Sequence, residues 1–252
     1  MLEAAFWGLI QGLTEFLPIS SSGHLVLVPA LLGQEPPDLA TSAMLHLGTL
    51  VAVLVYFRRD VVDVLTFTEK GKRLLTLVLI GTIPAAVLGL TLESQFEWLN
   101  ERPRGVALAL LITGVALFST RWIRRGTRTS GEATIKDTII MGFGQALALI
   151  PGVSRSGSTI TTGLLRGFTD AEAARYSFLL GIPAIAGAGI FEGKDLFDSG
   201  ATVGSEILVG VAVAAVSGYA AIAVLLRLIG RTGLSPFGLY CIVAATVALL
   251  LL

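Results

Sequence analysis

The amino-acid sequence predicts an all-α polytopic membrane protein with six transmembrane helices and two re-entrant helical hairpins, arranged as an inverted-topology repeat. Apolar residues make up 54% of the chain and charged residues 14%, whereas about 25% of a typical soluble domain is charged. Several apolar runs approach the roughly 20 residues that a helix needs to span a bilayer. The two halves of the chain also match each other at an offset of 134 residues. We therefore treat residues 1–252 as a single membrane domain with repeat halves at 1–125 and 134–252.

The first half is predicted to open with a re-entrant hairpin. Residues 2–17 are apolar apart from a few polar side chains and are stopped by Pro18, and a second short apolar piece follows at residues 25–32. Neither piece comfortably spans a bilayer, so together they predict a hairpin with its turn at residues 20–23. Non-helical backbone is tolerated at such depth only where it is buried in protein or lines a wet cavity.

Three spanning helices are predicted in the rest of the first half, at residues 41–57, 74–92 and 105–120. Pro84 lies inside the second of them and predicts a kink. A polar, arginine-rich linker at residues 121–136 then separates the two halves.

The second half repeats this order. Apolar stretches at residues 139–150 and 160–165 flank a polar turn, and three further spans are predicted at residues 176–191, 207–226 and 234–252. Pro183 lies inside the fourth span, as Pro84 does inside the second.

The distribution of basic residues predicts the orientation of the two halves. An odd number of spans in each half inverts the second half relative to the first. Of the 18 Lys and Arg residues, only Arg102, Arg104 and Lys194 fall on the side predicted to face outside, and Arg155 lies within a motif. Basic residues favour the cytoplasmic side, so both termini are predicted outside. The first hairpin then enters from outside and the second from the cytoplasm, and their tips can meet near the midplane, as in transporters with broken helices.

A polar motif, PGVSRSGST at residues 151–159, lies between two apolar runs of the second half. Its glycines allow the backbone to approach a ligand closely, and Ser154, Ser156 and Thr159 offer hydroxyls. Arg155 offers a fork of donors that suits phosphate. A helix expected to begin near Ser156 would direct its free N–H groups to the same place, which favours an anion.

A second motif, QGLTEFLPISSSGH at residues 11–24, matches the first at the 134-residue offset. The matched pairs are Gly8 with Gly142, Gln11 with Gln145, Ser20 with Ser154, Ser22 with Ser156 and Gly23 with Gly157. The first copy carries Glu15 and His24, which the second lacks, and the second carries Arg155, which the first lacks. Complementary chemistry on two related elements predicts one shared site.

Several residues of these motifs are candidates for catalysis. A lone carboxylate such as Glu15 is costly in apolar surroundings, so its default interpretation is functional, although a structural pair with Arg155 is the alternative. Glu15 could orient or deprotonate an attacking group, or hold Mg²⁺ or Ca²⁺ through oxygen ligands. Either Ser21 or His24 could attack phosphorus, and His24 could also transfer protons. For His46 we favour a structural role or one in support of the site.

These motifs resemble those of the undecaprenyl-diphosphate phosphatase family associated with bacitracin resistance. Residues 11–24 match its first motif, residues 151–159 match its PGxSRSxxT motif in full, and the length and repeat plan fit over essentially the whole chain. The resemblance implies an enzyme of the inner membrane that hydrolyses undecaprenyl diphosphate to undecaprenyl phosphate and inorganic phosphate at a site facing outside. It would recycle the lipid carrier of peptidoglycan synthesis, on which cell shape depends, and confer bacitracin resistance.

Motif matching assigns the family's functional positions to Glu15, Ser21, His24, Ser154, Arg155 and Thr159. The remaining polar side chains, Gln11, Ser20, Ser22 and Ser156, are expected to help bind the substrate. Many family members carry Glu where this chain has Gln11, so a metal held by two carboxylates is not implied here.

The expected partners are a polyprenyl diphosphate and membrane lipid, and a homodimer is left open. Nucleic acid is not expected, because the net charge is zero and gives no overall attraction to it. Direct attack by water also stays open. The competing interpretation is a secondary transporter or lipid flippase for an anionic substrate, because inverted repeats and broken helices serve transporters equally well. A transporter needs an anion site but no Glu, Ser and His beside it.

Overall fold

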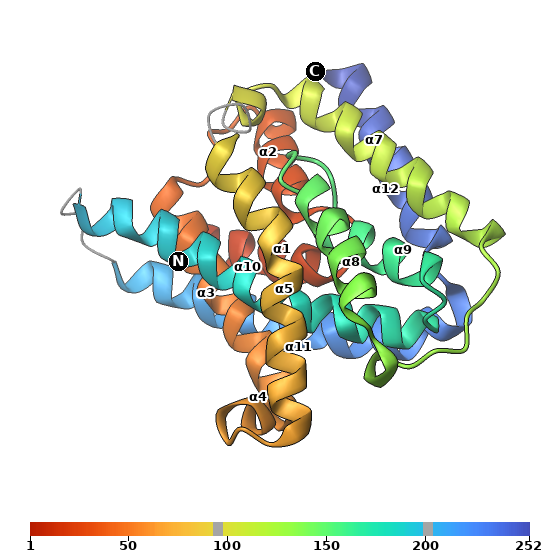
Figure 1. Cartoon of the computed structure of the whole chain (residues 1–252). Coiled ribbons are helices and arrows are strands. Elements are labelled where there is room, and N and C mark those ends of the chain that lie inside the picture. The colour runs from red at the N-terminus through yellow and green to blue at the C-terminus, as the bar shows by residue number, and fades with distance from the viewer. Residues whose placement is uncertain (93–97, 199–203) are drawn as a thin grey trace.

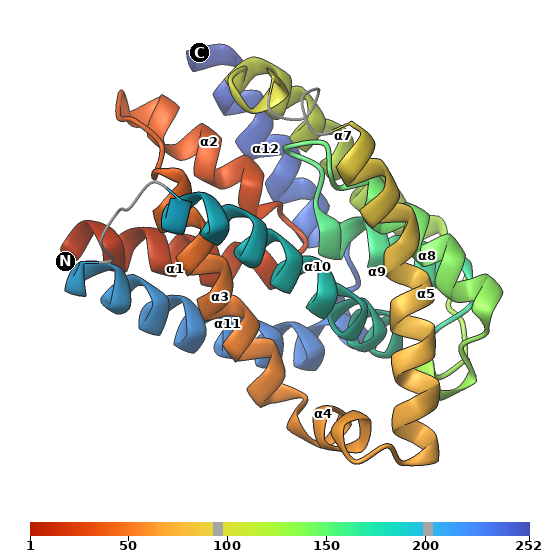
Figure 2. The same ribbon diagram turned by 60° about the vertical axis from the view of Figure 1, so that its left-hand side comes forward.

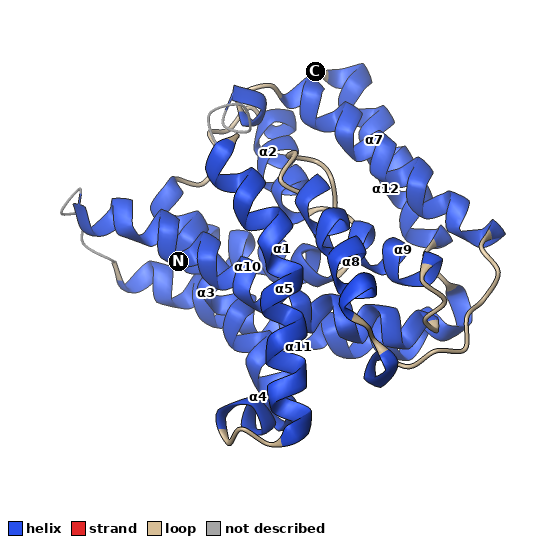
Figure 3. Cartoon of the chain, viewed as in Figure 1, coloured by secondary structure: helices blue, strands red, loops and turns tan. Residues whose placement is uncertain are grey.

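The computed structural model describes residues 1–92, 98–198 and 204–252, and every regular element in these ranges is a helix (Figure 1 and Figure 3). The one β-type pairing among them is an isolated bridge between Arg128 and Phe168. The all-α prediction is confirmed.

The first predicted hairpin consists of α1 (Leu2–Phe16) and α2 (Ser21–Leu32). The predicted turn at residues 20–23 is too long, because α2 already begins at Ser21. The hydroxyl of Ser20 accepts a hydrogen bond from the Gly23 N–H at 3.2 Å and caps the helix one turn earlier than expected. Ser21 and Ser22 therefore lie in the first turn of a helix.

The rest of the first half contains α3 (Leu39–Tyr56), α4 (Arg58–Leu65), α5 (Glu69–Thr91) and α7 (Pro103–Ser119). The sequence did not predict α4, which turns away from α3 by 84°. Helix α5 passes Pro84 without interruption.

The second half contains α8 (Ile135–Leu147), α9 (Arg155–Leu165), α10 (Asp170–Asp198), α11 (Ser205–Thr232) and α12 (Ser235–Leu251). Within the described ranges, three helical segments are long and apolar enough to cross a membrane: Glu69–Thr91, Pro103–Trp122 and Ser205–Thr232. The bent pair of α3 and α4 would count as a fourth only if the two helices formed one broken span, and α2 and α12 are shorter apolar helices. The molecule is thus a helical membrane protein, and the count of six spans stays a prediction.

Glycines allow the first helix of each predicted hairpin to approach a helix of the other half. A Cβ on Gly8 of α1 would overlap the carbonyl oxygen of Gly210 in α11, and a Cβ on Gly142 of α8 would overlap that of Gly81 in α5. Figure 2 shows α1 beside α11 and α8 beside α5. Both contacts need glycine because only a residue without Cβ lets backbones come so close.

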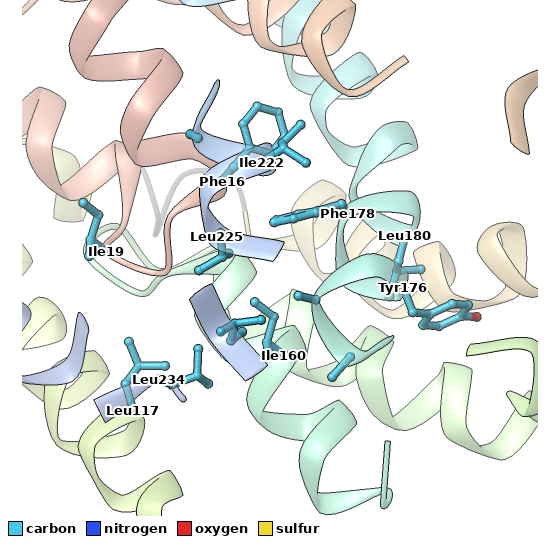
Figure 4. Packing of buried hydrophobic residues seen from close by; sticks show 14 of the residues in the cluster. Phe16, Ile19, Leu117, Ile160, Tyr176, Phe178, Leu180, Ile222, Leu225 and Leu234 are labelled. Carbon is cyan, nitrogen blue, oxygen red and sulfur yellow. The ribbon is translucent and has the colours of Figure 1, made fainter. Parts of the chain in front are cut away.

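A buried apolar cluster lies where the two hairpins meet α10 and α11 (Figure 4). Phe16, the residue after Glu15, packs edge to face on Phe178 with ring centroids 5.5 Å apart. Within a membrane such packing stabilises the fold through close van der Waals contact, and an aromatic pair of this geometry contributes about 0.5–1.5 kcal/mol. The packing fixes the end of α1 and hence the position of Glu15.

A buried carboxylate ties the linker between the halves to the second hairpin. Asp137 lies 2.6 Å from Arg128 Nη2 and 2.7 Å from Arg166 Nε, and it also accepts hydrogen bonds from Thr134. Burial opposes its ionisation, but the hydrogen bonds from Arg128, Thr134 and Arg166 outweigh burial and hold the pKa of Asp137 well below its usual range.

Candidate active site

The turns of the two predicted motifs lie against each other, and they have the same local structure. Ser154 caps α9 by accepting from the Gly157 N–H at 3.1 Å, as Ser20 caps α2. The next hydroxyl is also placed alike, with 3.3 Å between the oxygens of Ser154 and Ser156 and 3.4 Å between those of Ser20 and Ser22. The site is therefore built around two helix N-termini, whose first N–H groups have no partner within their helices.

The second motif is held in place by three hydrogen bonds that the sequence did not predict. Thr113 of α7 donates to the carbonyl oxygen of Gly152 at 3.1 Å and accepts from the Ser154 N–H at 3.3 Å. Ser156 donates to the carbonyl oxygen of Leu17 at 3.2 Å and so joins the two turns directly. Gly152 has φ +94° and faces the α7 backbone, a conformation that favours glycine.

Glu15 is the centre of the site and is buried. Its Oε1 lies 2.7 Å from Arg155 Nη2, and its Oε2 accepts from Ser21 Oγ at 2.6 Å and from Gln11 Nε2 at 3.2 Å. The predicted meeting of the two motifs is thus present, and both carboxylate oxygens have donors.

Arg155 uses only part of its guanidinium for this contact. Its Nη1 is buried and has no hydrogen-bond partner among the described residues. The group passes over Gly181 of α10, where a Cβ would lie 2.6 Å from Arg155 Cζ. Gly181 therefore makes room for the guanidinium, and the donor hydrogens on Nη1 have no partner among the described residues.

A pocket of about 180 Å³ opens over this cluster. Six of the predicted site residues line it, namely Glu15, Ser20, Ser21, Ser22, Ser154 and Arg155. Gln145 also lines it, and both polar atoms of its side chain are buried without a partner among the described residues. Gln145 is the repeat counterpart of Gln11, so the 134-residue offset was the signal that could have marked it.

His46 of α3 also lines the pocket. Its Nδ1 lies 2.9 Å from the carbonyl oxygen of Ser42, and because a carbonyl only accepts, Nδ1 carries the proton there. The sequence marked His46 as ambiguous, and the structure places it in the wall of the site.

Four predicted site residues lie outside the pocket lining: Gln11, His24, Ser156 and Thr159. Gln11 contacts Glu15 from behind, and Ser156 contacts the first turn. Thr159 Oγ1 lies 2.7 Å from the carbonyl oxygen of Arg155 and also contacts Ser177. These hydroxyl and amide groups support the turns that carry the lining residues.

His24 has partners on both ring nitrogens. Nδ1 lies 2.8 Å from the carbonyl oxygen of Ser20, and Nε2 lies 2.7 Å from the hydroxyl of Tyr240 in α12. The carbonyl requires a proton on Nδ1, so neutral His24 accepts from Tyr240 through Nε2. The ring therefore braces α2 against α12, with the two rings stacked 5.7 Å apart.

The donor set fits a divalent cation only in part. In the described ranges no group of three or more His, Cys, Asp or Glu side chains comes together. Gln11 Oε1, however, is buried without a partner there, and it lies one helical turn from Glu15. Mg²⁺ is often held by one or two protein oxygens together with substrate phosphates, so Glu15 and Gln11 are the residues that would hold it.

An apolar groove of about 410 Å³ adjoins the pocket between α5 and α10. The groove and the pocket share four lining residues: Ala85, Leu149, Ala184 and Ala188. Most of its other lining residues are small, including Gly89 and Gly187. A polar site and an apolar groove are therefore continuous.

Comparisons with known proteins identify the family of this chain. The family model described as bacitracin resistance protein BacA matches residues 4–247. A protein of Pelobacter propionicus named undecaprenyl-diphosphatase is 42% identical, with 97% of this chain and 94% of the relative covered. Relatives of the same name from Hahella chejuensis and Methanosphaera stadtmanae are 44% and 38% identical, and cover 95% and 100% of this chain and 93% and 98% of their own length. This chain belongs to the BacA family of bacitracin resistance proteins.

Proposed function

We propose that this protein is a membrane phosphatase that hydrolyses undecaprenyl diphosphate to undecaprenyl phosphate and inorganic phosphate. The observation that carries the proposal is a serine hydroxyl bonded to a buried carboxylate, next to an arginine with free donors. The names of the relatives support the same substrate. In the cell the reaction would recycle the lipid carrier of peptidoglycan synthesis and give bacitracin resistance.

Binding of the diphosphate is assigned to donors that lack a partner in the protein. Arg155 Nη1 and Gln145 Nε2 are both buried donors of lining residues. The first-turn N–H groups of α2 and α9 add two anion-binding helix ends. Together they would hold phosphate oxygens and stabilise the charge that develops as the bridging bond breaks.

Ser21 is proposed as the nucleophile and Glu15 as its base. Ser21 Oγ would form a bond to the terminal phosphorus while the bridging P–O bond breaks and undecaprenyl phosphate leaves. The Ser21 proton passes to Glu15 Oε2, which it already contacts at 2.6 Å. Water would then attack the phosphoserine, releasing inorganic phosphate and returning the proton to Ser21.

His24 is assigned to positioning rather than to attack. Both of its nitrogens are bonded to protein atoms, and it does not line the pocket. Its bond to the Ser20 carbonyl oxygen steadies the turn before Ser21.

The prenyl tail is assigned to the groove between α5 and α10. The groove begins where the polar pocket ends and is lined mainly by aliphatic residues. A lipid substrate needs such a continuity, because its diphosphate must reach Arg155 while its tail stays in apolar surroundings.

The proposal also includes the membrane topology, with six spans and two re-entrant hairpins arranged as an inverted repeat. In this topology the site opens to the outer side of the inner membrane. The paired serine caps and the two glycine crossings support the repeat. The basic residues support the orientation. Single cysteines at Gln34 and Thr127 test it, since Gln34→Cys should react with an impermeant thiol reagent in intact cells and Thr127→Cys should not.

A bound Mg²⁺ or Ca²⁺ would neutralise phosphate charge beside Glu15 and Gln11. Activity should then fall with a chelator and return with the ion, and an unchanged rate at excess chelator would remove the metal from the proposal. A homodimer is a separate prediction, which the mass of the detergent-solubilised protein tests.

The deciding experiment is phosphate release by purified protein from a prenyl diphosphate, followed by rapid quenching. The wild type should release phosphate and show phosphate on Ser21, and Ser21→Ala should abolish both. Ser235→Ala, at the start of α12 outside the pocket, is the matched control and should behave as the wild type. Transport of the intact lipid without phosphate release would favour the transporter interpretation, and turnover without any covalent species would favour direct attack by water.

A further inference from the structure

A second polar cavity, of about 470 Å³, lies at the junction of α3 and α4 with α10 and α11. It shares no lining residue with the active-site pocket. Tyr56 in its wall follows His46 of the active site by ten residues, which is about 15 Å along α3. The cavity lies near the end of the molecule that carries α4, and the C-terminus is at the opposite end (Figure 1 and Figure 2).

The cavity offers positive charge that the protein does not neutralise. Its lining includes Arg58, Arg59 and Arg175 and the carboxylates Asp60 and Glu172. Both carboxylates already have hydrogen-bond or ion-pair partners within the protein. Asp60 accepts from Arg175 at 2.6 Å and contacts Lys70 at 3.1 Å, and Glu172 accepts from the Ser130 N–H at 2.8 Å.

Arg58 and Arg59 differ from Arg175, because both are exposed and neither has a hydrogen bond or ion pair to any residue in the described ranges. A guanidinium presents five N–H donors in a planar fork that matches phosphate oxygens. Two adjacent unpaired arginines at a cavity mouth therefore form a site for an anionic phosphate group.

The neighbouring side chains place this cavity at the level of lipid headgroups. The rings of Tyr56 and Tyr219 lie 5.2 Å apart between α3 and α11, and tyrosine is enriched at membrane interfaces. Helix α4, bent by 84° from α3, exposes Val62 and Leu65. A short helix with such a face is typical of one lying in the interface.

We propose that this cavity binds the phosphate headgroup of an anionic phospholipid from the predicted cytoplasmic leaflet. Arg58 and Arg59 contact the phosphate, and the acyl chains run beside Tyr56, Tyr219 and Leu226. Basic pockets between helices on the cytoplasmic side hold anionic lipid headgroups in this way. The interfacial position of α4 favours lipid over free phosphate as the source. The site is independent of the phosphatase reaction.

The test is native mass spectrometry of the delipidated full-length protein, titrated with phosphatidylglycerol, phosphatidylcholine or inorganic phosphate. Phosphatidylglycerol should bind more tightly than phosphatidylcholine. Each basic residue at an anionic surface contributes about fivefold, so Arg58→Gln with Arg59→Gln should weaken phosphatidylglycerol binding about 30-fold. The variant with Arg58→Lys and Arg59→Lys keeps both positive charges and should retain most of the wild-type affinity for phosphatidylglycerol.

Arg227→Gln with Arg231→Gln removes the same charge from exposed positions of α11 that do not line the cavity, so it serves as the matched control. An equal loss in that variant would overturn the site, and equal binding of both lipids would overturn its anionic specificity. Binding of inorganic phosphate as tight as that of phosphatidylglycerol would assign the site to free phosphate and overturn the lipid as its ligand. Unchanged melting of the Arg58 and Arg59 variants verifies that they fold.

Discussion

Arg155 Nη2 lies 2.7 Å from Glu15 Oε1, although the two residues are 140 positions apart in the chain. The contact joins the tip of the second hairpin to the last turn of α1. One residue is thus oriented by the other, and the same carboxylate holds Ser21 at 2.6 Å through its second oxygen. The Glu15 carboxylate therefore both contacts the proposed nucleophile and holds the two hairpins together. Experiments have to distinguish its role in catalysis from its role in stability.

Glu15→Gln should abolish most turnover while the protein stays folded. Glutamine keeps the shape and some hydrogen bonding but cannot take the proton of Ser21, so we expect kcat to fall by about 10²- to 10⁴-fold. Phosphate release and thermal unfolding in detergent measure the two effects. Glu3→Gln, an exposed change on the same helix, should leave both unchanged, and near-normal hydrolysis by the Glu15 variant would leave Glu15 with a structural role only.

Gly181→Ala should inactivate the enzyme from outside the pocket lining. A methyl group there would lie 2.6 Å from Arg155 Cζ, so the guanidinium has to move away from Glu15. We expect a drop in kcat of about 10²-fold or more, because misplacement of a positioning group by about 1 Å costs as much. Gly230→Ala, where a Cβ meets open space, is the control. If Gly181→Ala turned over normally, the guanidinium would not need its present position.

The meeting of the two motifs could be predicted because the sequence displays the repeat directly. It also shows that one copy carries Glu15 and the other carries Arg155. It did not predict Thr113, which holds the second turn from α7. Nothing in an apolar span distinguishes a threonine that contacts a distant loop from one that bonds to its own helix. Helix α4 was missed for a different reason, since the charged residues Arg58, Arg59 and Asp60 follow Phe57 directly and indicated the end of the span.

The proposed preference for Ser21 over His24 as the nucleophile rests on contacts that the sequence does not display. Ser21 lies within the predicted turn and His24 directly after it, but in the structure it is Ser21 that donates a hydrogen bond to the Glu15 carboxylate. His24 is turned to the Ser20 carbonyl oxygen and to Tyr240, which is 216 positions away. A partner at that distance in the chain leaves no local signal.

Asp137→Asn should lower the stability of the fold rather than the chemistry. Removing the charge leaves Arg128 and Arg166 without their carboxylate, at a cost of about 3 kcal/mol. The pKa of Asp137 is lowered on folding, so its stabilisation is present above the unfolded value of about 3.9 and is lost as the pH falls below it. Thermal unfolding should therefore separate wild type and variant fully at pH 7, and the gap should shrink progressively below about pH 4 and close only below the lowered folded pKa of Asp137. Glu69→Gln removes an exposed pair with Lys72 and should change little; a constant gap at all pH values would contradict the assigned charge.

Arg155 allows the two roles of its contact with Glu15 to be distinguished. If it binds phosphate, Arg155→Lys should keep some substrate binding and lose much of the rate, because lysine offers a point charge instead of a fork. Arginine contacts in phosphoryl transfer contribute about 10³-fold or more, so kcat should change far more than KM.

If Arg155 only holds the hairpins together, Arg155→Lys should have a mild effect, and Arg155→Ala should destabilise the fold by leaving the Glu15 carboxylate buried and unpaired. Adding Glu15→Ala to that variant would then restore part of the stability. The buried Nη1, which has no partner in the described ranges, favours the first outcome, since a purely structural arginine would use both of its terminal nitrogens. Melting temperature and kinetics on the three variants decide between them, and a stable Arg155→Ala protein with unchanged kcat would remove the phosphate-binding role.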